Sequence, residues 1–210
     1  MAYDKFTILK STAVPLPTEN VDTDQIIPAR FLKATEREGF GDNLFRDWRY
    51  DVEGNPKKDF VLNNPTYSGK ILVAGKNFGS GSSREHAVWA LHEFGIRAVI
   101  APSFAPIFFG NCVRNGIVPV RLAEAAVAAL AGHAGTDPQA NTITVDLEAR
   151  EVRAGTTQRF AFDIDAESRD MLLEGLDAID LTLKSRKEIA AFVERDRVAR
   201  PWIYSGAVVE

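Results

Sequence analysis

Two serines and an arginine stand directly before a helix-patterned segment. The stretch GSGSSREHAVWALHEFG, residues 79–95, places Ser82, Ser83 and Arg84 after two glycines and ahead of apolar residues at helical spacing. The first N–H groups of a helix lack partners within the helix and lie at the positive end of its dipole, so they bind anions readily. An arginine there is unfavourable for the dipole unless an anion shares the site, and its planar guanidinium suits a carboxylate. These residues predict a helix end that binds a carboxylate or a phosphate.

A capping interpretation of the same residues stays open. Ser82 and Glu85 have the spacing of a capping box, in which the serine caps the helix and the glutamate reaches back to the serine amide. That arrangement leaves Gly79, Gly81 and Arg84 unexplained. The stretch matches neither a Walker phosphate loop, since no lysine follows Gly81, nor a dinucleotide fingerprint, since Arg84 stands in place of the third glycine.

Alternating strand and helix patterns surround the glycine- and serine-rich residues 79–84. Short apolar runs at 70–75, 97–102 and 117–122 alternate with helix-patterned segments, which predicts a βαβαβ unit with parallel strands. A further strand is expected near the N-terminus, and 141–165 has the alternation and turn residues of antiparallel hairpins. We therefore expect an α/β fold with a mixed, mainly parallel sheet and flanking helices.

The rest of the chain is predicted to belong to the same unit. Residues from about 31 to 69 are rich in Gly, Asn, Asp and Pro, which is typical of a long functional loop. Helices are expected over about 166–204, with alternating charges that indicate a solvated face. We interpret 1–210 as a single domain that carries this loop and a helical C-terminal segment.

Composition narrows the class of protein. The 210 residues are 45% hydrophobic and 26% charged, with a net charge of −4, which indicates a globular protein and no affinity for nucleic acid or membrane surfaces. No run approaches the roughly 18 apolar residues of a membrane span, and the N-terminus lacks a signal-peptide pattern. We expect a cytoplasmic protein.

A single cysteine limits the metal chemistry of the chain. Cys112 lies among large apolar residues, which favours an inert core thiol over a reactive one. His86 and His92 are six residues apart and point to different sides of a helix. A zinc site or an iron–sulfur cluster held by this chain alone is therefore not expected.

Two motifs carry a resemblance to a known family. GKNFGSGSSREHA resembles the GxxxGxGSSREHA motif of the swivelling domain of the aconitase superfamily, and NVDTDQIIPARFL resembles its DTDxIxP motif. Their order and the following RAVIAPSFAPIFFGNCVRNG make most of the chain similar to small subunits of 3-isopropylmalate dehydratase. The resemblance implies a swivelling β/β/α fold and a hydro-lyase. Such an enzyme interconverts 2- and 3-isopropylmalate through 2-isopropylmaleate in leucine biosynthesis.

The resemblance also implies a partner and roles for the site residues. The partner is a large subunit that carries a 4Fe-4S cluster. Such a cluster needs three thiolate ligands, and this chain has only one cysteine. Ser82 would be the base and Asp24 the second catalytic residue. Ser83 and Arg84 would bind substrate carboxylates, and Arg30 would add a substrate contact. A surface position for Arg30 remains the alternative, because the alignment there needs a gap.

Other interpretations of the motifs remain open. Asp22, Thr23 and Asp24 could form a loop that caps itself, and Ser80 could cap the helix in place of Ser82. Residues 31–50 should border the isopropyl group, with Phe31 and Leu32 as an apolar wall or as core.

Two alternatives to the dehydratase function stay in view. One is the small subunit of a homoaconitase or a citraconate-type hydratase. The other is an anion-binding module without catalysis.

Overall fold

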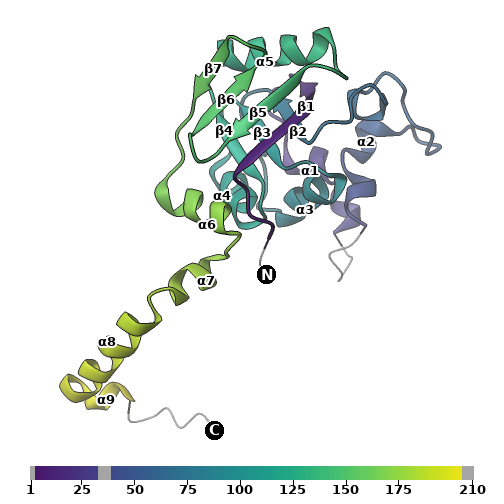
Figure 1. The fold of residues 1–210 in the computed structure, drawn as a ribbon. Coiled ribbons are helices and arrows are strands. Elements are labelled where there is room, and N and C mark those ends of the chain that lie inside the picture. The colour runs from purple at the N-terminus through teal and green to yellow at the C-terminus, as the bar shows by residue number, and fades with distance from the viewer. Residues whose placement is uncertain (1–2, 33–38, 205–210) are drawn as a thin grey trace.

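A mixed sheet runs through the computed structural model, which describes residues 3–32 and 39–204. Within that range the sheet has seven strands in the order β4-β3-β2-β1-β5-β6-β7 (Figure 1). The strands are β1 (Ile8–Leu16), β2 (Ile71–Ala74), β3 (Ala98–Ala101), β4 (Val118–Arg121), β5 (Thr142–Asp146), β6 (Glu151–Ala154) and β7 (Gln158–Ala161).

Strand β1 joins a parallel half of the sheet to an antiparallel half. Its C-terminal part pairs with β2 in parallel, with Ala13 opposite Ile71, and β3 and β4 continue that half. Its N-terminal part pairs with β5 in antiparallel, with Ile8 opposite Asp146, and β6 and β7 follow as hairpins. The predicted mixed sheet, the βαβαβ unit and the hairpins are confirmed.

Helices cover both faces of the sheet and continue into a C-terminal extension. Helix α3 ends at Gly95, which has a left-handed φ of 106°, and α4 starts with a proline in its first turn. The helices are α1 (Thr23–Ile26), α2 (Arg46–Arg49), α3 (Glu85–Phe94), α4 (Pro106–Arg114), α5 (Glu124–Thr136), α6 (Ala166–Glu174), α7 (Ala178–Leu183), α8 (Arg186–Ala199) and α9 (Pro201–Tyr204), with 3-10 turns η1 (Ala29–Phe31), η2 (Gly41–Asn43) and η3 (Val61–Asn63).

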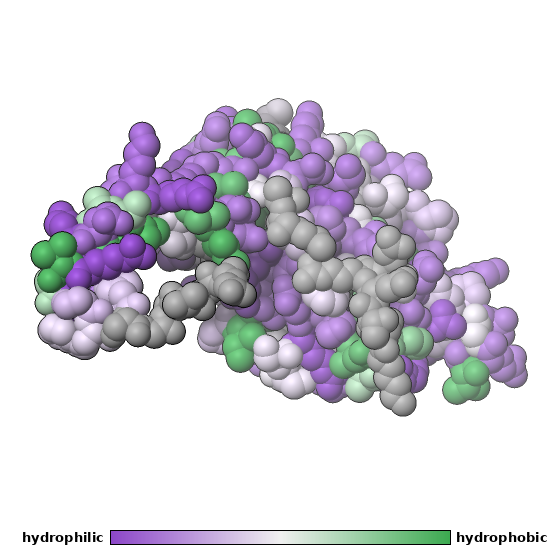
Figure 2. All heavy atoms as spheres, turned by 90° about the horizontal axis from the view of Figure 1, so that it is seen from below, coloured by the Kyte–Doolittle hydropathy of each residue, from purple (hydrophilic) through white to green (hydrophobic). Residues whose placement is uncertain are grey.

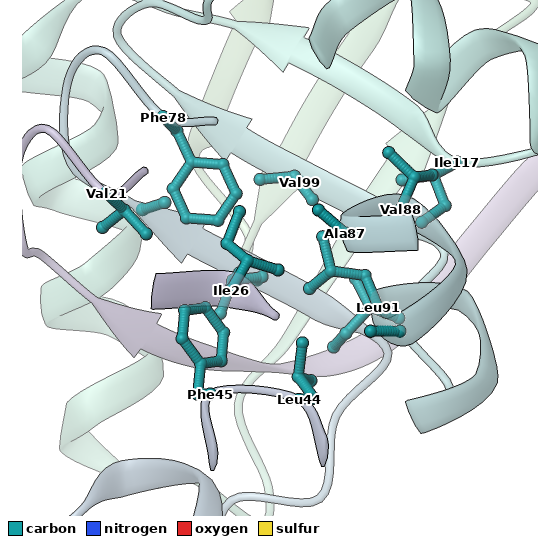
Figure 3. Packing of buried hydrophobic residues seen from close by; sticks show 14 of the residues in the cluster. Val21, Ile26, Leu44, Phe45, Phe78, Ala87, Val88, Leu91, Val99 and Ile117 are labelled. Atoms are coloured by element: carbon teal, nitrogen blue, oxygen red, sulfur yellow. The ribbon is translucent and has the colours of Figure 1, made fainter. Parts of the chain in front are cut away.

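Two hydrophobic cores lie on opposite faces of the sheet. Because side chains alternate along a strand, Leu72 and Ala74 of β2 enter one core while Ile71 and Val73 enter the other. The first core contains buried residues of α3 and α4, among them Cys112, and Figure 3 shows part of it. Burial raises the pKa of the Cys112 thiol well above its ordinary value, as expected for an inert core residue.

Part of the predicted loop contributes to this first core. Phe40, Leu44 and Phe45 are buried members of this core, and the Phe40 ring packs against His86 and Trp89 of α3. The segment is therefore irregular but anchored, with η2, α2 and η3 along its length. Residues 33–38 of the predicted loop lie outside the described residues.

The last helices project from the body. Figure 1 shows α7, α8 and α9 leaving it beyond α6, and α8 is exposed along most of its length, as its alternating charges predicted. Figure 2 shows apolar side chains on these projecting helices; Phe192 and Trp202 are exposed there. Within the described ranges, no helix combines the length and apolar character needed to cross a membrane.

Candidate active site

The two sequence motifs lie against each other beyond the ends of β1 and β2. The backbone N–H groups of Gly79 and Ser80 donate to the Val21 carbonyl oxygen at 2.8 and 3.1 Å, and the Thr23 N–H donates to the Ser80 carbonyl oxygen at 2.9 Å. A short parallel bridge links Asp22 to Ser80. Main-chain hydrogen bonds thus hold the DTD motif (residues 22–24) against the glycine-serine turn (residues 79–84), although neither segment belongs to the sheet.

Glycine is required in the turn by close packing and by backbone angle. Gly79 has a φ of 76°, and a Cβ atom there would lie 2.1 Å from Cγ of Phe108. Gly81 has a φ of 90°, a conformation that residues with a Cβ rarely adopt. Close packing against α4 therefore requires glycine at position 79, and the backbone angle favours glycine at position 81.

The capping-box interpretation of Ser82 and Glu85 is wrong. Helix α3 begins at Glu85 with Arg84 as its N-cap, and no side chain caps it. The Glu85 carboxylate instead accepts a hydrogen bond from the buried Asn115 at 2.8 Å. Ser80 does not cap the helix either, because its hydroxyl donates to the Asn20 carbonyl oxygen at a long 3.5 Å.

A capping box is present at the other motif. Asp22 caps α1: its carboxylate accepts from the Gln25 N–H at 2.8 Å, and the Gln25 side chain accepts from the Asp22 N–H at 2.9 Å. The self-capping interpretation therefore holds for Asp22. It leaves Asp24, in the first turn of α1, available for another role.

Asp24 and Arg84 form an ion pair across the two motifs. Arg84 Nη1 donates to the Asp24 carboxylate, and the side chains are 17% and 54% exposed for Arg84 and Asp24, respectively. This hydrogen bond from Arg84 lowers the pKa of Asp24 below its ordinary value of 3.8, and the Ala29 backbone N–H adds to the effect. Asp24 is therefore an anion that faces solvent at physiological pH, next to a guanidinium that is mostly covered.

The two candidate serines lie in the exposed part of the turn. Ser82 and Ser83 are solvent-exposed, and within the described residues neither hydroxyl makes a hydrogen bond. The Ser82 main chain is nevertheless fixed, because the hydroxyl of the buried Thr23 donates to its carbonyl oxygen at 2.9 Å. The serine side chains are available to a ligand while their backbone is held.

Arg30 is directed to a different place from Arg84. It pairs with Asp47, and the hydrogen bond between them raises the pKa of Arg30 and lowers that of Asp47. Both residues, with Phe31 and Tyr50, line a cleft of about 710 Å³, and none of the described lining residues belongs to the glycine-serine turn. Ala29, whose backbone N–H lowers the pKa of Asp24, directly precedes Arg30 in η1.

Several side-chain contacts near the site had no clear sequence signal. His86, inside the longer motif, packs its ring against Phe40 and Trp89, with centroids 5.3 and 4.6 Å apart. Glu93 accepts from the N–H groups of Gly39 and Gly41 at 2.7 and 2.8 Å. Only the fold brings these pairs together, although Phe40 and the other apolar residues of the predicted loop were a partial indication that the loop packs on the core.

Comparison with known families defines the class of protein. The Aconitase C-terminal domain family model matches residues 3–125, and the LeuD_N model matches residues 133–166. The chain belongs to the family of aconitase C-terminal domains. The fold agrees, because a mixed sheet with flanking helices also relates it to a solved structure. That structure is 3-isopropylmalate dehydratase (leuD) from Methanocaldococcus jannaschii, with a TM-score of 0.62, 28% identity, and coverage of 88% of this chain and 98% of that chain.

Curated relatives give the particular branch of that family. The 3-isopropylmalate dehydratase small subunit of Cupriavidus necator is 51% identical over 204 residues, covering 96% of this chain and 98% of the relative. The protein of the same name from Parvibaculum lavamentivorans is 51% identical over 201 residues, 95% of this chain and all of the relative. This chain is a member of the family of 3-isopropylmalate dehydratase small subunits.

The residues of this chain do not fit an iron–sulfur cluster. Such a cluster is held by several cysteine thiolates, and the sequence has one cysteine, whose buried thiol has a raised pKa. Among residues 3–32 and 39–204 no group of three His, Cys, Asp or Glu side chains is arranged to hold a metal ion.

Proposed function

We propose that this chain is the small subunit of a hydro-lyase that interconverts 2-isopropylmalate and 3-isopropylmalate through 2-isopropylmaleate in leucine biosynthesis. The near full-length similarity to named small subunits supports the reaction. One structural observation supports the site: Arg84, paired with Asp24, lies beside two exposed serines at the start of α3. The enzyme acts in the cytoplasm as a complex with a large subunit.

Arg84 binds a substrate carboxylate by the edge that Asp24 leaves available. A guanidinium has five N–H donors in a planar fork, and in the described structure only Nη1 donates to Asp24. The remaining edge can hold a carboxylate with two hydrogen bonds, assisted by the unpaired N–H groups at the start of α3. Ser83 adds a hydroxyl at the same end. Asp24 orients the guanidinium.

Ser82 takes the proton from the carbon next to a substrate carboxylate. A serine hydroxyl is a very weak acid, so this role needs a positive environment that stabilises the alkoxide. The positive end of the α3 dipole and Arg84 provide it. Because the Ser82 hydroxyl has no hydrogen-bond partner among the described residues, it need not leave one in order to reach the substrate.

The large subunit would hold the group that supplies Lewis-acid chemistry for the departure of the hydroxyl group. The resemblance implies that this is a 4Fe-4S cluster on the partner, and the residues of this chain are unsuited to hold one. This chain therefore contributes anion binding and the proton acceptor. The segment 31–50, which includes Phe31, borders the alkyl group of the substrate.

Reconstitution with an iron–sulfur-loaded large subunit tests the proposal. We expect wild type to form 2-isopropylmaleate from 2-isopropylmalate, followed by the ultraviolet absorbance of the enoate. Ser82→Ala should abolish turnover without changing the melting temperature, because its exposed hydroxyl bonds nothing in the described structure. Ser83→Ala should mainly raise KM.

Substrate choice separates the proposal from its alternatives. Preference for a substrate with a third carboxylate would favour a homoaconitase-type enzyme, and binding of dicarboxylates without any turnover would favour a non-catalytic module. Undiminished turnover by Ser82→Ala would refute the assignment of the base.

A further inference from the structure

A buried amide lies beneath the first turn of α3. Asn115, which follows the last residue of α4, is 1% exposed, and its side chain makes four hydrogen bonds. Its Oδ1 accepts from Tyr3 Oη and from Trp89 Nε1, each at 2.9 Å. Its Nδ2 donates to the Glu85 carboxylate and to the Asn111 carbonyl oxygen, each at 2.8 Å. The hydrogen-bonding capacity of the amide is therefore fully used.

These four hydrogen bonds fix the orientation of the Asn115 amide and the position of the Glu85 carboxylate. Three separate parts of the chain converge on Asn115: the segment before β1, helix α3, and the end of α4. Rotating the amide by half a turn would set its NH₂ group against the two donors, Tyr3 Oη and Trp89 Nε1, so one orientation is strongly preferred. The Glu85 carboxylate is consequently held at one position by a charge-assisted hydrogen bond.

Glu85 links the amide to the candidate active site. It is the first residue of α3 and follows Arg84 directly. No side chain caps this helix end, so its position depends on contacts from neighbouring elements. On the α1 side these contacts are the Asp24–Arg84 pair and the hydrogen bond from Thr23 to the Ser82 carbonyl oxygen. On the α4 side the contact is the hydrogen bond from Asn115.

We propose that Asn115 is a positioning residue for the isomerase reaction. By holding Glu85 it fixes the first turn of α3, and this keeps Arg84 aligned for the substrate carboxylate. The inference rests on the proposed function for its kinetic consequences. It differs from a purely structural role, because misalignment of Arg84 should weaken substrate binding beyond any general loss of stability.

Asn115→Asp tests the proposal with little change in size. The new carboxylate places an oxygen against the Glu85 carboxylate, where like charges repel. In the complex with the large subunit, we expect KM for 2-isopropylmalate to rise by about tenfold, as a small misplacement of a binding group can cause, while kcat changes less. Adding Glu85→Gln supplies an amide that can donate to the new carboxylate, so the double variant should recover much of the wild-type KM.

A matched control separates positioning from stability. Val152 is fully buried in β6, in the core on the other face of the sheet, and Val152→Ala should lower the melting temperature without raising KM. Hydrogen exchange of the amides of residues 89–92, which bond back to the first turn of α3, should quicken in Asn115→Asp and not in Val152→Ala when measured on the isolated chain. This second measurement does not require activity, so it tests the inference even if the proposed function fails.

Three results would overturn the inference. One is an equal rise of KM in Asn115→Asp and Val152→Ala at equal loss of melting temperature. The second is unchanged KM and unchanged exchange in Asn115→Asp. The third is no recovery in the double variant. Should Asn115→Asp fail to fold, Glu85→Ala, which removes a partly exposed side chain, must raise KM similarly.

Discussion

The Thr23 hydroxyl donates a hydrogen bond to the Ser82 carbonyl oxygen at 2.9 Å, across 59 positions of sequence. Thr23 is only 2% exposed, and its own N–H donates to the Ser80 carbonyl oxygen. One residue of the DTD motif therefore holds the turn at two carbonyl groups. This explains why threonine stands between the two aspartates: Asp22 caps α1, Asp24 pairs with Arg84, and Thr23 fixes the serines.

Replacing Thr23 should separate the effect of the hydroxyl from that of packing. Thr23→Val keeps the shape but leaves the Ser82 carbonyl oxygen without this donor, which should cost about 1–2 kcal/mol in the free energy of unfolding. Turnover should fall further than stability predicts, because Ser82 loses its position. Thr23→Ser retains the donor and should retain most activity. Urea unfolding and steady-state kinetics measure both effects; equal turnover in the valine and serine variants would contradict this account.

Periodicity was sufficient to predict the central unit of the fold. Strands β2 and β3 are four-residue apolar runs buried on both faces, and α3 carries its buried Ala87, Val88 and Leu91 at helical spacing. These patterns are local, so they are readable from sequence. The motif also predicted that Arg84 binds a ligand carboxylate; in the structure Arg84 pairs with Asp24, and carboxylate binding stays a prediction.

Contacts between distant polar residues could not be predicted in the same way. Glu85 has the correct spacing to bond Ser82, but its carboxylate accepts a hydrogen bond from the buried Asn115 instead. Arg30 pairs with Asp47, which belongs to a segment without periodicity. Such choices depend on which elements the fold brings together, and spacing along the chain does not encode them.

The Asp24–Arg84 pair should give a defined dependence on pH. The hydrogen bond from Arg84 lowers the pKa of Asp24 below 3.8 in the folded state. The pair therefore contributes fully to stability at pH values above 3.8, and its contribution disappears as the pH falls through the lowered folded value. Carboxyl titration by NMR should place Asp24 below its ordinary pKa in wild type and near that value in Arg84→Gln. An identical titration in both chains would contradict the pairing.

Arg30 and Asp47 offer a test of the cleft. Their ion pair is exposed, so Arg30→Gln and Asp47→Asn should each change the free energy of unfolding by less than about 1 kcal/mol. If Arg30 contacts the substrate, Arg30→Gln should raise KM, whereas Asp47→Asn releases the guanidinium and should not. Comparing KM in the two variants, with urea unfolding as the control, decides the question. An unchanged KM in Arg30→Gln would favour the surface interpretation of this residue.

Gly79 and Gly132 have opposite surroundings, so substitution by alanine should change the free energy of unfolding in opposite directions at the two positions. Gly79→Ala would place Cβ 2.1 Å from the Phe108 ring at a φ of 76°, so the turn must shift or the chain must unfold. We expect the free energy of unfolding to fall by about 3 kcal/mol or more, since overpacking and backbone strain combine. Gly132 lies inside α5, where a Cβ atom would have no heavy atom of the described structure within 4 Å beyond its own helix backbone and chain neighbours. There, substitution by alanine should raise the free energy of unfolding by at most about 1 kcal/mol, because alanine favours the helix and restricts the unfolded chain. Urea unfolding of both variants measures the contrast, and a stable, active Gly79→Ala chain would show that the turn does not need to approach α4 so closely.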